Sequence, residues 1–200
     1  EFERRYQAMQ GLKKAELIEG VVFMASAVRI RQHGNPHSRL VTWLGVYEQN
    51  TPGVLSMDNS TIRLDLDNEP QPDAGLMIEP ECGGQSTISD DDYVEGAPEL
   101  VAEIAGSSAS IDLNTKFRVY RRNKVREYIV WRILDGAIDW FVLRNSQFES
   151  IEQSADGILR SECFAGLWLD SAAMVRRDWT TVDKVLQQGL NTPEHAAFVA

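Results

Sequence analysis

The chain has 200 residues, 43% hydrophobic and 25% charged, which suits one globular domain with a substantial core. Thirty acidic residues against twenty basic ones give a formal net charge of −10, which excludes a surface that attracts nucleic acid over its whole extent. No apolar run is long enough to cross a bilayer, no secretory signal is recognisable, and Cys82 and Cys163 lack metal-ligand spacing, so we expect a cytoplasmic protein without membrane contact.

The charges are unevenly distributed along the chain. Residues 79–103 contain acidic residues and no basic one, whereas residues 116–126 contain basic residues and no acidic one. The acidic members are Glu79, Glu81, Asp90, Asp91, Asp92, Glu95, Glu99 and Glu103, and the basic members are Lys116, Arg118, Arg121, Arg122, Lys124 and Arg126. A solvated face explains either run alone, and any contact with a polyanion depends on local charge.

The first half of the chain predicts helices, strands and a long loop. A short helix is expected over residues 1–9 and a strand over 16–24. Asn35 and Pro36 supply a polar cap and a first-turn proline, and the apolar spacing after them predicts a helix to about Gln49. Residues 54–57 and 61–66 predict a hairpin, 72–78 a strand, and 80–96 a loop rich in glycine and acidic residues.

The second half predicts a strand over residues 100–105, a connection of small residues and a helix over 111–123. Strands over 126–134 and 138–143 meet at Asp135-Gly136, a hairpin dipeptide. Shorter strands are expected over 148–151 and 158–169, followed by a helical tail from Asp178. This order predicts a single α/β domain over residues 1–200, a mixed sheet flanked by helices, with its core at about 15–143 and C-terminal strands and helix at 144–200.

Glu103 lies inside the apolar strand predicted over residues 100–105. Strand alternation places it on the face of Val101 and Ala105, and three apolar residues occupy the other face. A carboxylate buried on both sides requires a cation, a metal ion or a proton. The alternatives are a strand end that reaches water and a buried ion pair.

Two further residues, Asp73 and Lys116, are candidate neighbours of Glu103 in the fold. Asp73 begins a strand and shares a face with Gly75, which is expected to leave space beside the carboxylate, although a turn residue after Pro72 is the alternative. Lys116 lies on the shoulder of the apolar stripe of the following helix, so its ammonium could reach the sheet edge and neutralise Glu103. A surface lysine is the alternative.

Together these residues resemble the PD-(D/E)XK nuclease superfamily and, more narrowly, its Uma-type domain, described as a putative restriction endonuclease. The resemblance extends in family order from about residue 15 to residue 143. Its segments are Glu16-Leu17-Ile18-Glu19-Gly20, His37 after Pro36, Pro72-Asp73, Ala97 to Ile104, Asp112 with Lys116 and Tyr120, and Val125-Arg126-Glu127-Tyr128.

The resemblance implies a restriction-endonuclease-like fold and a site for Mg²⁺ or Mn²⁺. Asp73 and Glu103 would be the metal ligands, and Lys116 the catalytic lysine, moved from the strand to the helix. Glu16 would be a supporting acid and Tyr120 a helical partner of Lys116. The implied partner is DNA, no membrane contact is expected, and a homodimer is compatible with the resemblance.

Several positions depart from the family pattern. Ala105 stands where the superfamily motif has its lysine, and Ala105-Gly106-Ser107 replaces the Leu-Ser-Pro that is typical after the strand. Lys124 stands where glycine is expected, and Ile129 and Arg132 replace a tryptophan and an aspartate. The expected metal ligands are unaffected by these changes.

Other candidate sites are less specific. Gly34 and Pro36 flank the helix start between His33 and His37, so these histidines are not expected to share a helical face as metal ligands. The five tryptophans are expected in the core or at an interface rather than in a base-stacking platform.

The leading hypothesis is a metal-dependent endonuclease that hydrolyses DNA phosphodiester bonds. A second hypothesis is a catalytically inactive nuclease-like fold that serves binding or assembly, favoured by the net charge and the altered motif flanks. A third is a structural protein in which Glu103 and Lys116 form only a buried ion pair.

Overall fold

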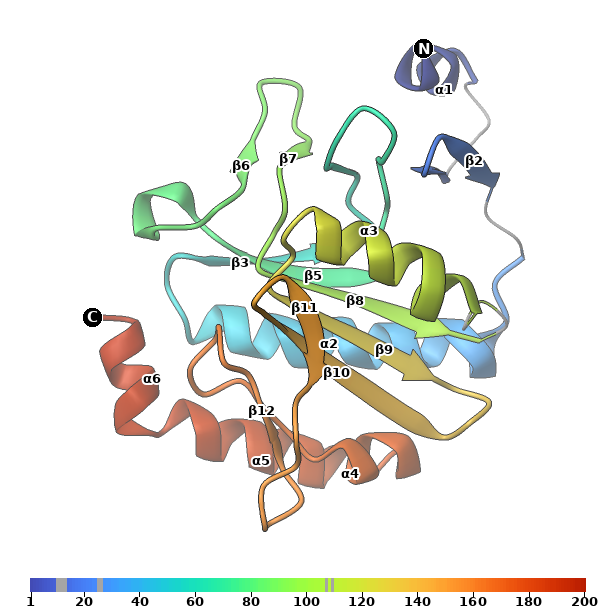
Figure 1. Cartoon of the computed structure of the whole chain (residues 1–200). Coiled ribbons are helices and arrows are strands. Elements are labelled where there is room, and N and C mark those ends of the chain that lie inside the picture. Colours follow the sequence, from blue (N-terminus) through green and yellow to red (C-terminus); the bar gives the residue numbers. More distant parts are fainter. Residues whose placement is uncertain (10–13, 25–26, 107, 109) are drawn as a thin grey trace.

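The computed structural model describes residues 1–9, 14–24, 27–106, 108 and 110–200. Its centre is a six-stranded mixed sheet with the order β11-β10-β9-β8-β5-β3, shown in Figure 1. The strands are β3 (Val54–Asp58), β5 (Ala74–Ile78), β8 (Leu100–Ala105), β9 (Glu127–Arg132), β10 (Ala137–Arg144) and β11 (Gln147–Ser150). Only the β8–β9 pair of this sheet is parallel. The predicted mixed sheet is confirmed.

Helices cover both faces of this sheet. Figure 1 shows α2 (Asn35–Gln49) behind the sheet and α3 (Phe117–Arg122) in front of it. The helices α4 (Ser171–Arg176) and α5 (Trp179–Leu190) pack on the side of α2. The remaining helices are α1 (Phe2–Ala8) and α6 (Pro193–Phe198), and within the described ranges no helix has both the length and the apolar character needed to cross a membrane.

The central strand β8 is buried on both faces, as its sequence predicts. Leu100, Ala102 and Ile104 join the apolar cluster on the α2 side. Val101 and Ala105 join the cluster on the α3 side, which is therefore the side of Glu103. β8 thus carries one carboxylate into an interior that is otherwise apolar.

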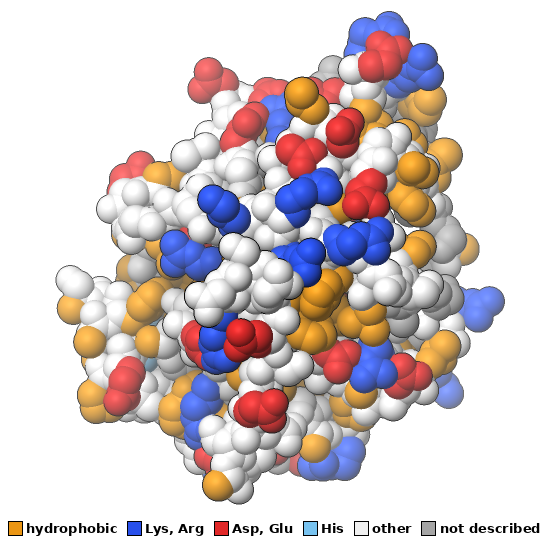
Figure 2. Space-filling view, in the orientation of Figure 1, with side chains coloured by type: hydrophobic (Ala, Val, Ile, Leu, Met, Phe, Trp, Pro, Cys, Tyr) orange, Lys and Arg blue, Asp and Glu red, His pale blue; other side chains and the backbone are white. Residues whose placement is uncertain are grey.

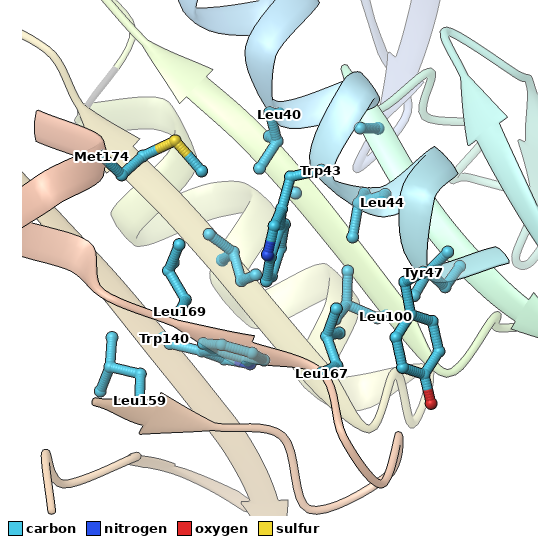
Figure 3. Packing of buried hydrophobic residues seen from close by; sticks show 14 of the residues in the cluster. Leu40, Trp43, Leu44, Tyr47, Leu100, Trp140, Leu159, Leu167, Leu169 and Met174 are labelled. Carbon is cyan, nitrogen blue, oxygen red and sulfur yellow. The ribbon is translucent and has the colours of Figure 1, made fainter. Parts of the chain in front are cut away.

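Aromatic residues fill the larger cluster, on the α2 side (Figure 3). The rings of Trp43 and Trp140 meet edge to face with centroids 5.9 Å apart. Trp43 Nε1 donates to the carbonyl oxygen of Trp168, and the Tyr47 hydroxyl donates to that of Ala165. The buried Trp43 and Trp140 confirm the prediction that they belong to the core.

Two buried carboxylates outside the candidate site have structural roles. Glu127 on β9 accepts hydrogen bonds from the backbone N–H groups of Glu162 and Cys163, which fixes the C-terminal segment against the sheet. Glu99 accepts from the N–H groups of Ile78 and Gln85, which fixes the acidic loop. Hydrogen bonds to backbone donors satisfy these acids without a metal ion or a lysine.

The single strand predicted over residues 16–24 is wrong. The segment forms a hairpin of β1 (Ala15–Ile18) and β2 (Val21–Met24). The turn residues Glu19 and Gly20 have φ angles of 50° and 75°, the positive values that a two-residue hairpin turn requires.

The hairpin predicted from residues 54–57 and 61–66 is also wrong. β3 pairs with β5, whereas β4 (Ile62–Arg63) pairs with β7 (Val94–Glu95), which in turn pairs with β6 (Thr87–Ile88). β4 ends early because the Asp65 carboxylate accepts hydrogen bonds from the Asp67 N–H and the Asn68 side chain, which turns the chain away. Part of the predicted loop over 80–96 is therefore sheet, and it begins with the 3₁₀ turn η2 (Pro80–Cys82).

Several other elements differ from the prediction. A π turn, η1 (Ile30–Gly34), precedes α2, so Asn35 continues a helix rather than capping one. Another π turn, η3 (Ile111–Lys116), leads into α3. The strand predicted over 158–169 is a hairpin of β12 (Leu159–Arg160) and β13 (Trp168–Leu169), and α4 is an additional helix.

The packing of β5 against β8 gives a stability prediction. A Cβ atom on Gly75 would lie 2.6 Å from Met57 Cε and 2.7 Å from the Leu100 carbonyl oxygen, whereas one on Gly45 of α2 would meet nothing within 4 Å. We expect Gly75→Ala to lower the free energy of unfolding by about 1–3 kcal/mol. Gly45→Ala should raise it by about 0.5–1 kcal/mol, since alanine favours the helix. Urea unfolding measures both, and equal effects of the two variants would contradict this packing.

Candidate active site

Lys116 joins two acids from distant segments of the chain. Its side chain is 7% exposed, and its Nζ lies 2.8 Å from Glu103 Oε1 and 2.8 Å from Glu16 Oε1. The Tyr120 hydroxyl, one turn further along the helix, donates to Glu103 Oε1 at 2.9 Å. The predicted reach of Lys116 from helix to strand is therefore confirmed, with the ammonium buried between two carboxylates.

Asp73 lies beside Glu103 because of the strand register. Ala74 of β5 pairs with Ala102 of β8, so the next positions, Asp73 and Glu103, stand opposite each other across the antiparallel pair. Opposed residues have side chains on the same face. Asp73 Oδ2 also accepts the N–H of Ile104 at 2.8 Å, which holds the carboxylate against β8.

The space predicted beside Asp73 at Gly75 is absent. The methyl group of Met57 and the carbonyl oxygen of Leu100 occupy the volume where a side chain would stand. Gly75 instead permits the close approach of β5 and β8 that sets the two carboxylates side by side.

Two residues that sequence reasoning missed also contact Asp73. His33 Nε2 lies 3.1 Å from each oxygen of the Asp73 carboxylate, and Lys14 Nζ lies 3.5 Å from Oδ1. His33 Nδ1 is buried and has no hydrogen-bond partner in the described structure. Lys14 lies two positions before Glu16, a spacing typical of one strand face, and this was the available sequence signal.

The expectation that His33 and His37 do not share a helical face is wrong. The π turn η1 runs directly into α2, so helical spacing continues across Gly34, and the two rings lie 5.6 Å apart. His37 Nε2 lies 2.8 Å from the carbonyl oxygen of Asp73 and 3.0 Å from Asp58 Oδ1. Both histidines therefore position the Asp73 segment.

Asp112 completes the group of acids. It is 3% exposed and accepts a hydrogen bond from the Ser108 hydroxyl at 2.6 Å. Its side chain caps no helix, since η3 has no side-chain cap. The Tyr128 hydroxyl donates to its backbone oxygen, which ties this turn to β9.

Carboxylates outnumber lysines in this buried region. Among the described residues, Glu16, Asp73, Glu103 and Asp112 face two lysines, Lys14 and Lys116. Burial raises the pKa of Glu103 to about 8, because the attraction of Lys116 does not offset desolvation and the neighbouring acids. Burial likewise raises the pKa of Asp112. If all four carboxyl groups were ionised, the site would carry excess negative charge, which a proton or a bound cation could neutralise.

Asp73 and Lys116 stay charged. Burial acts to raise the pKa of Asp73, but the hydrogen bond from His33 and the charge of Lys14 outweigh it and lower the pKa to about 2. Burial acts to lower the pKa of Lys116, but the charges of Glu103, Glu16 and Asp112 outweigh it and raise the pKa above its usual value.

The donor set fits a hard divalent cation that keeps part of its water shell. Both hydrogen bonds to Glu103 end on Oε1, and Oε2 accepts none from the described residues. Within the described ranges, no group of three or more His, Cys, Asp or Glu side chains is arranged to hold a metal ion by itself. Mg²⁺ requires fewer, since it is commonly held by one or two carboxylates together with water and substrate phosphates.

Comparison with known proteins gives one family and one fold. The family model Uma2, described as "Putative restriction endonuclease", matches residues 1–172. The solved structure of "a putative nuclease belonging to DUF820 from Anabaena variabilis ATCC 29413" is similar, with a TM-score of 0.63, 12% identity, and coverage of 84% of this chain and 97% of that one. At this identity the likeness concerns the fold. None of the curated proteins compared with the chain matches it.

The raised pKa of Glu103 predicts how the free energy of unfolding varies with pH in chelator-treated, metal-free protein. A carboxyl group with a pKa of 4.5 when unfolded and about 8 when folded contributes stability that is fully present below 4.5 and is lost as the pH rises through about 8. We expect Glu103→Gln to reduce the fall in unfolding free energy over this range, measured by urea unfolding at several pH values. The exposed control Glu152→Gln should keep the wild-type slope. If unfolding free energy fell with pH as steeply in Glu103→Gln as in the wild type, the pKa of Glu103 would not be the cause of the fall.

Proposed function

Because the chain belongs to the Uma2 family, described as "Putative restriction endonuclease", we propose that it is a Mg²⁺- or Mn²⁺-dependent endonuclease that hydrolyses phosphodiester bonds in DNA. One observation carries this proposal. The start of β5, the strand β8 and the turn η3 bring Asp73, Glu103 and Lys116 to one buried region, in which carboxylates exceed lysines among the described residues. Such an excess suits a bound divalent cation and, through it, a phosphate.

Asp73 and Glu103 would hold the metal ion from neighbouring strands. The ligand oxygens would be Glu103 Oε2, which accepts no hydrogen bond from the described residues, and the carboxylate of Asp73. Bound Mg²⁺ would supply a Lewis acid for the scissile phosphate and lower the pKa of a coordinated water. Asp73 is ionised at neutral pH, whereas Glu103 would release a proton when it becomes a ligand.

Lys116 would place a fixed positive charge beside the reacting phosphate. Its raised pKa keeps the ammonium protonated at neutral pH. A charge already held in position stabilises the negative charge that develops in the transition state without further reorganisation. Lys116 supplies this charge in place of the lysine that the superfamily motif has at position 105, here the buried Ala105.

Glu16 and Tyr120 would act as positioning residues. Glu16 Oε1 accepts from both Lys116 Nζ and the backbone N–H of Gln71, so it fixes the ammonium relative to the segment before Asp73. The Tyr120 hydroxyl donates to the same Glu103 oxygen as Lys116 and leaves the other oxygen available. Each residue thus orients a group that would meet metal or substrate.

A catalytically inactive binding module is the second candidate. It is favoured by the direct contact between Lys116 and Glu103 and by the contacts of His33 and Lys14 with Asp73, which give these acids protein partners. An ion pair alone explains Lys116 and Glu103 but not the additional buried carboxylates. This module would have the same thermal stability in Mg²⁺ and in chelator.

Cleavage of plasmid DNA in Mg²⁺ or Mn²⁺ tests the proposal. We expect Asp73→Asn, Glu103→Gln and Lys116→Met each to slow cleavage by about 10²-fold or more, because each removes a ligand or a charge that acts in the transition state. The exposed control Glu152→Gln should cleave at the wild-type rate. Cleavage that persists unchanged in Asp73→Asn and Glu103→Gln would remove these residues from the mechanism, and absence of cleavage by the wild-type chain would favour the inactive module.

A further inference from the structure

A basic hollow lies on the outer side of α3, away from the sheet. It measures about 320 Å³ and opens between α3, the β10–β11 turn and the tip of the β1–β2 hairpin. Figure 2 shows Lys and Arg side chains gathered over this region of the face. The lining residues are Glu19, Arg118, Arg121, Arg122, Lys124, Leu143 and Ser146. Because the chain has a net charge of −10, such a concentration of positive charge is a local feature.

Acidic neighbours neutralise this basic hollow only in part. Glu19 lies 3.2 Å from Arg118 and 3.8 Å from Arg122, which also lies 3.5 Å from Asp65. Arg121 and Lys124 form no ion pair within the described ranges, and Arg121 is oriented by a hydrogen bond to the Gln147 side chain. Four cations and one carboxylate therefore line the hollow, which leaves positive charge for an external anion.

The backbone at Lys124 is a second, independent observation. The Val125 N–H donates to the Tyr120 carbonyl and the Lys124 N–H donates to the Arg121 carbonyl, the pair of bonds that ends a helix in a Schellman motif. The residue in the left-handed position of this motif is usually glycine, yet Lys124 occupies it with φ 67°. The chain thus accepts an unfavourable backbone conformation and gains a cation at the hollow.

Stabilisation of the helix end explains only part of this arrangement. Basic side chains in the last helical turn interact favourably with the helix dipole, which accounts for Arg121 and Arg122. Arg118 lies in the first turn of α3, where a cation has no such benefit, and Lys124 lies beyond the helix end. Arg118 and Lys124 line the same hollow, and this shared position indicates a binding site for an anionic ligand.

We propose that the basic hollow binds the phosphate backbone of a DNA strand that enters the candidate active site, an inference that rests on the proposed nuclease function. β1 links the two places, since Glu16 contacts Lys116 at the site and Glu19 lies at the hollow. β1 ends at Ile18 and Glu19 is the first turn residue, so at roughly 3.3 Å per strand residue the three steps span at most about 10 Å. That span corresponds to about three nucleotides of a strand in duplex DNA.

The role of the hollow in DNA binding can be measured in the Asp73→Asn protein, which is expected to leave the DNA uncleaved. In this background, Arg121→Glu with Lys124→Glu reverses the two cations that form no ion pair, so no salt bridge is lost. Fluorescence anisotropy with a short labelled duplex should show binding weakened by about tenfold or more, and a slope of log affinity against log salt reduced by about two. Equal affinity and slope in the two proteins would overturn the proposal, as would a lack of DNA binding by Asp73→Asn protein itself.

The end of α4 provides a matched control. Arg176 lies in its last turn, and Arg177 follows in the left-handed conformation with φ 64°, on the opposite side of the sheet from α3. Arg176→Glu with Arg177→Glu should leave DNA binding unchanged. If the wild-type protein does not cleave DNA while binding still depends on Arg121 and Lys124, the proposed function fails and DNA binding by the hollow stands. Cleavage that requires Asp73, together with binding that does not depend on Arg121 and Lys124, overturns the hollow alone.

A glycine substitution separates binding from folding. Lys124→Gly should raise the melting temperature, because glycine suits the left-handed position, and should also weaken DNA binding. Arg177→Gly should raise the melting temperature without a change in binding. A Lys124→Gly protein that binds DNA as tightly as its parent would assign Lys124 no part in the hollow.

Discussion

Like charges buried together are the constraint around which the site is built. The carboxylates of Glu16, Asp73, Glu103 and Asp112 share a largely buried region in which the described residues place two ammonium groups, those of Lys14 and Lys116. Desolvation of a carboxylate is costly unless a proton, a cation or hydrogen-bond donors compensate it. Lys116, the Tyr120 hydroxyl and the Ile104 N–H each provide part of this compensation. Lys14 and His33 provide it for Asp73, and the raised pKa of Glu103 leaves a proton on that carboxyl group at neutral pH.

The scaffold fixes this charge distribution through strand register. Asp73 and Glu103 meet because β5 and β8 are antiparallel neighbours, and a slip of one residue would turn either side chain to the opposite face. The parallel β8–β9 connection then carries η3 and α3 back over the same face, which delivers Lys116. The same helix presents arginines on its outer side, so one short segment separates the buried charges around Lys116 from the outer basic hollow.

Much of this was predictable from sequence where one periodic pattern determines the environment. The apolar residues around Glu103 predicted a carboxylate buried on both sides, and the helical spacing placed Lys116 where it could reach this carboxylate or remain at the surface. The β1–β2 turn at Glu19-Gly20 and the short β4 depend on local turn hydrogen bonds that compete with strand patterns. His33 was missed because a π turn continues helical spacing across a glycine and a proline. Strand spacing alone could place Lys14 on the face of Glu16, but its contact with Asp73 depends on where the β1 hairpin lies against the sheet, which no local pattern encodes.

Calorimetric titration of chelator-treated protein with Mg²⁺ and Mn²⁺, in buffers of different ionisation enthalpy near neutral pH, decides whether Asp73 and Glu103 bind a divalent metal ion. We predict saturable binding with release of up to one proton, because the pKa of Glu103 is about 8 before the metal ion binds. We also predict binding that is greatly weakened in Asp73→Asn. Absence of binding heat in the wild-type protein, or the same affinity in Asp73→Asn, would contradict a metal site formed by these two carboxylates.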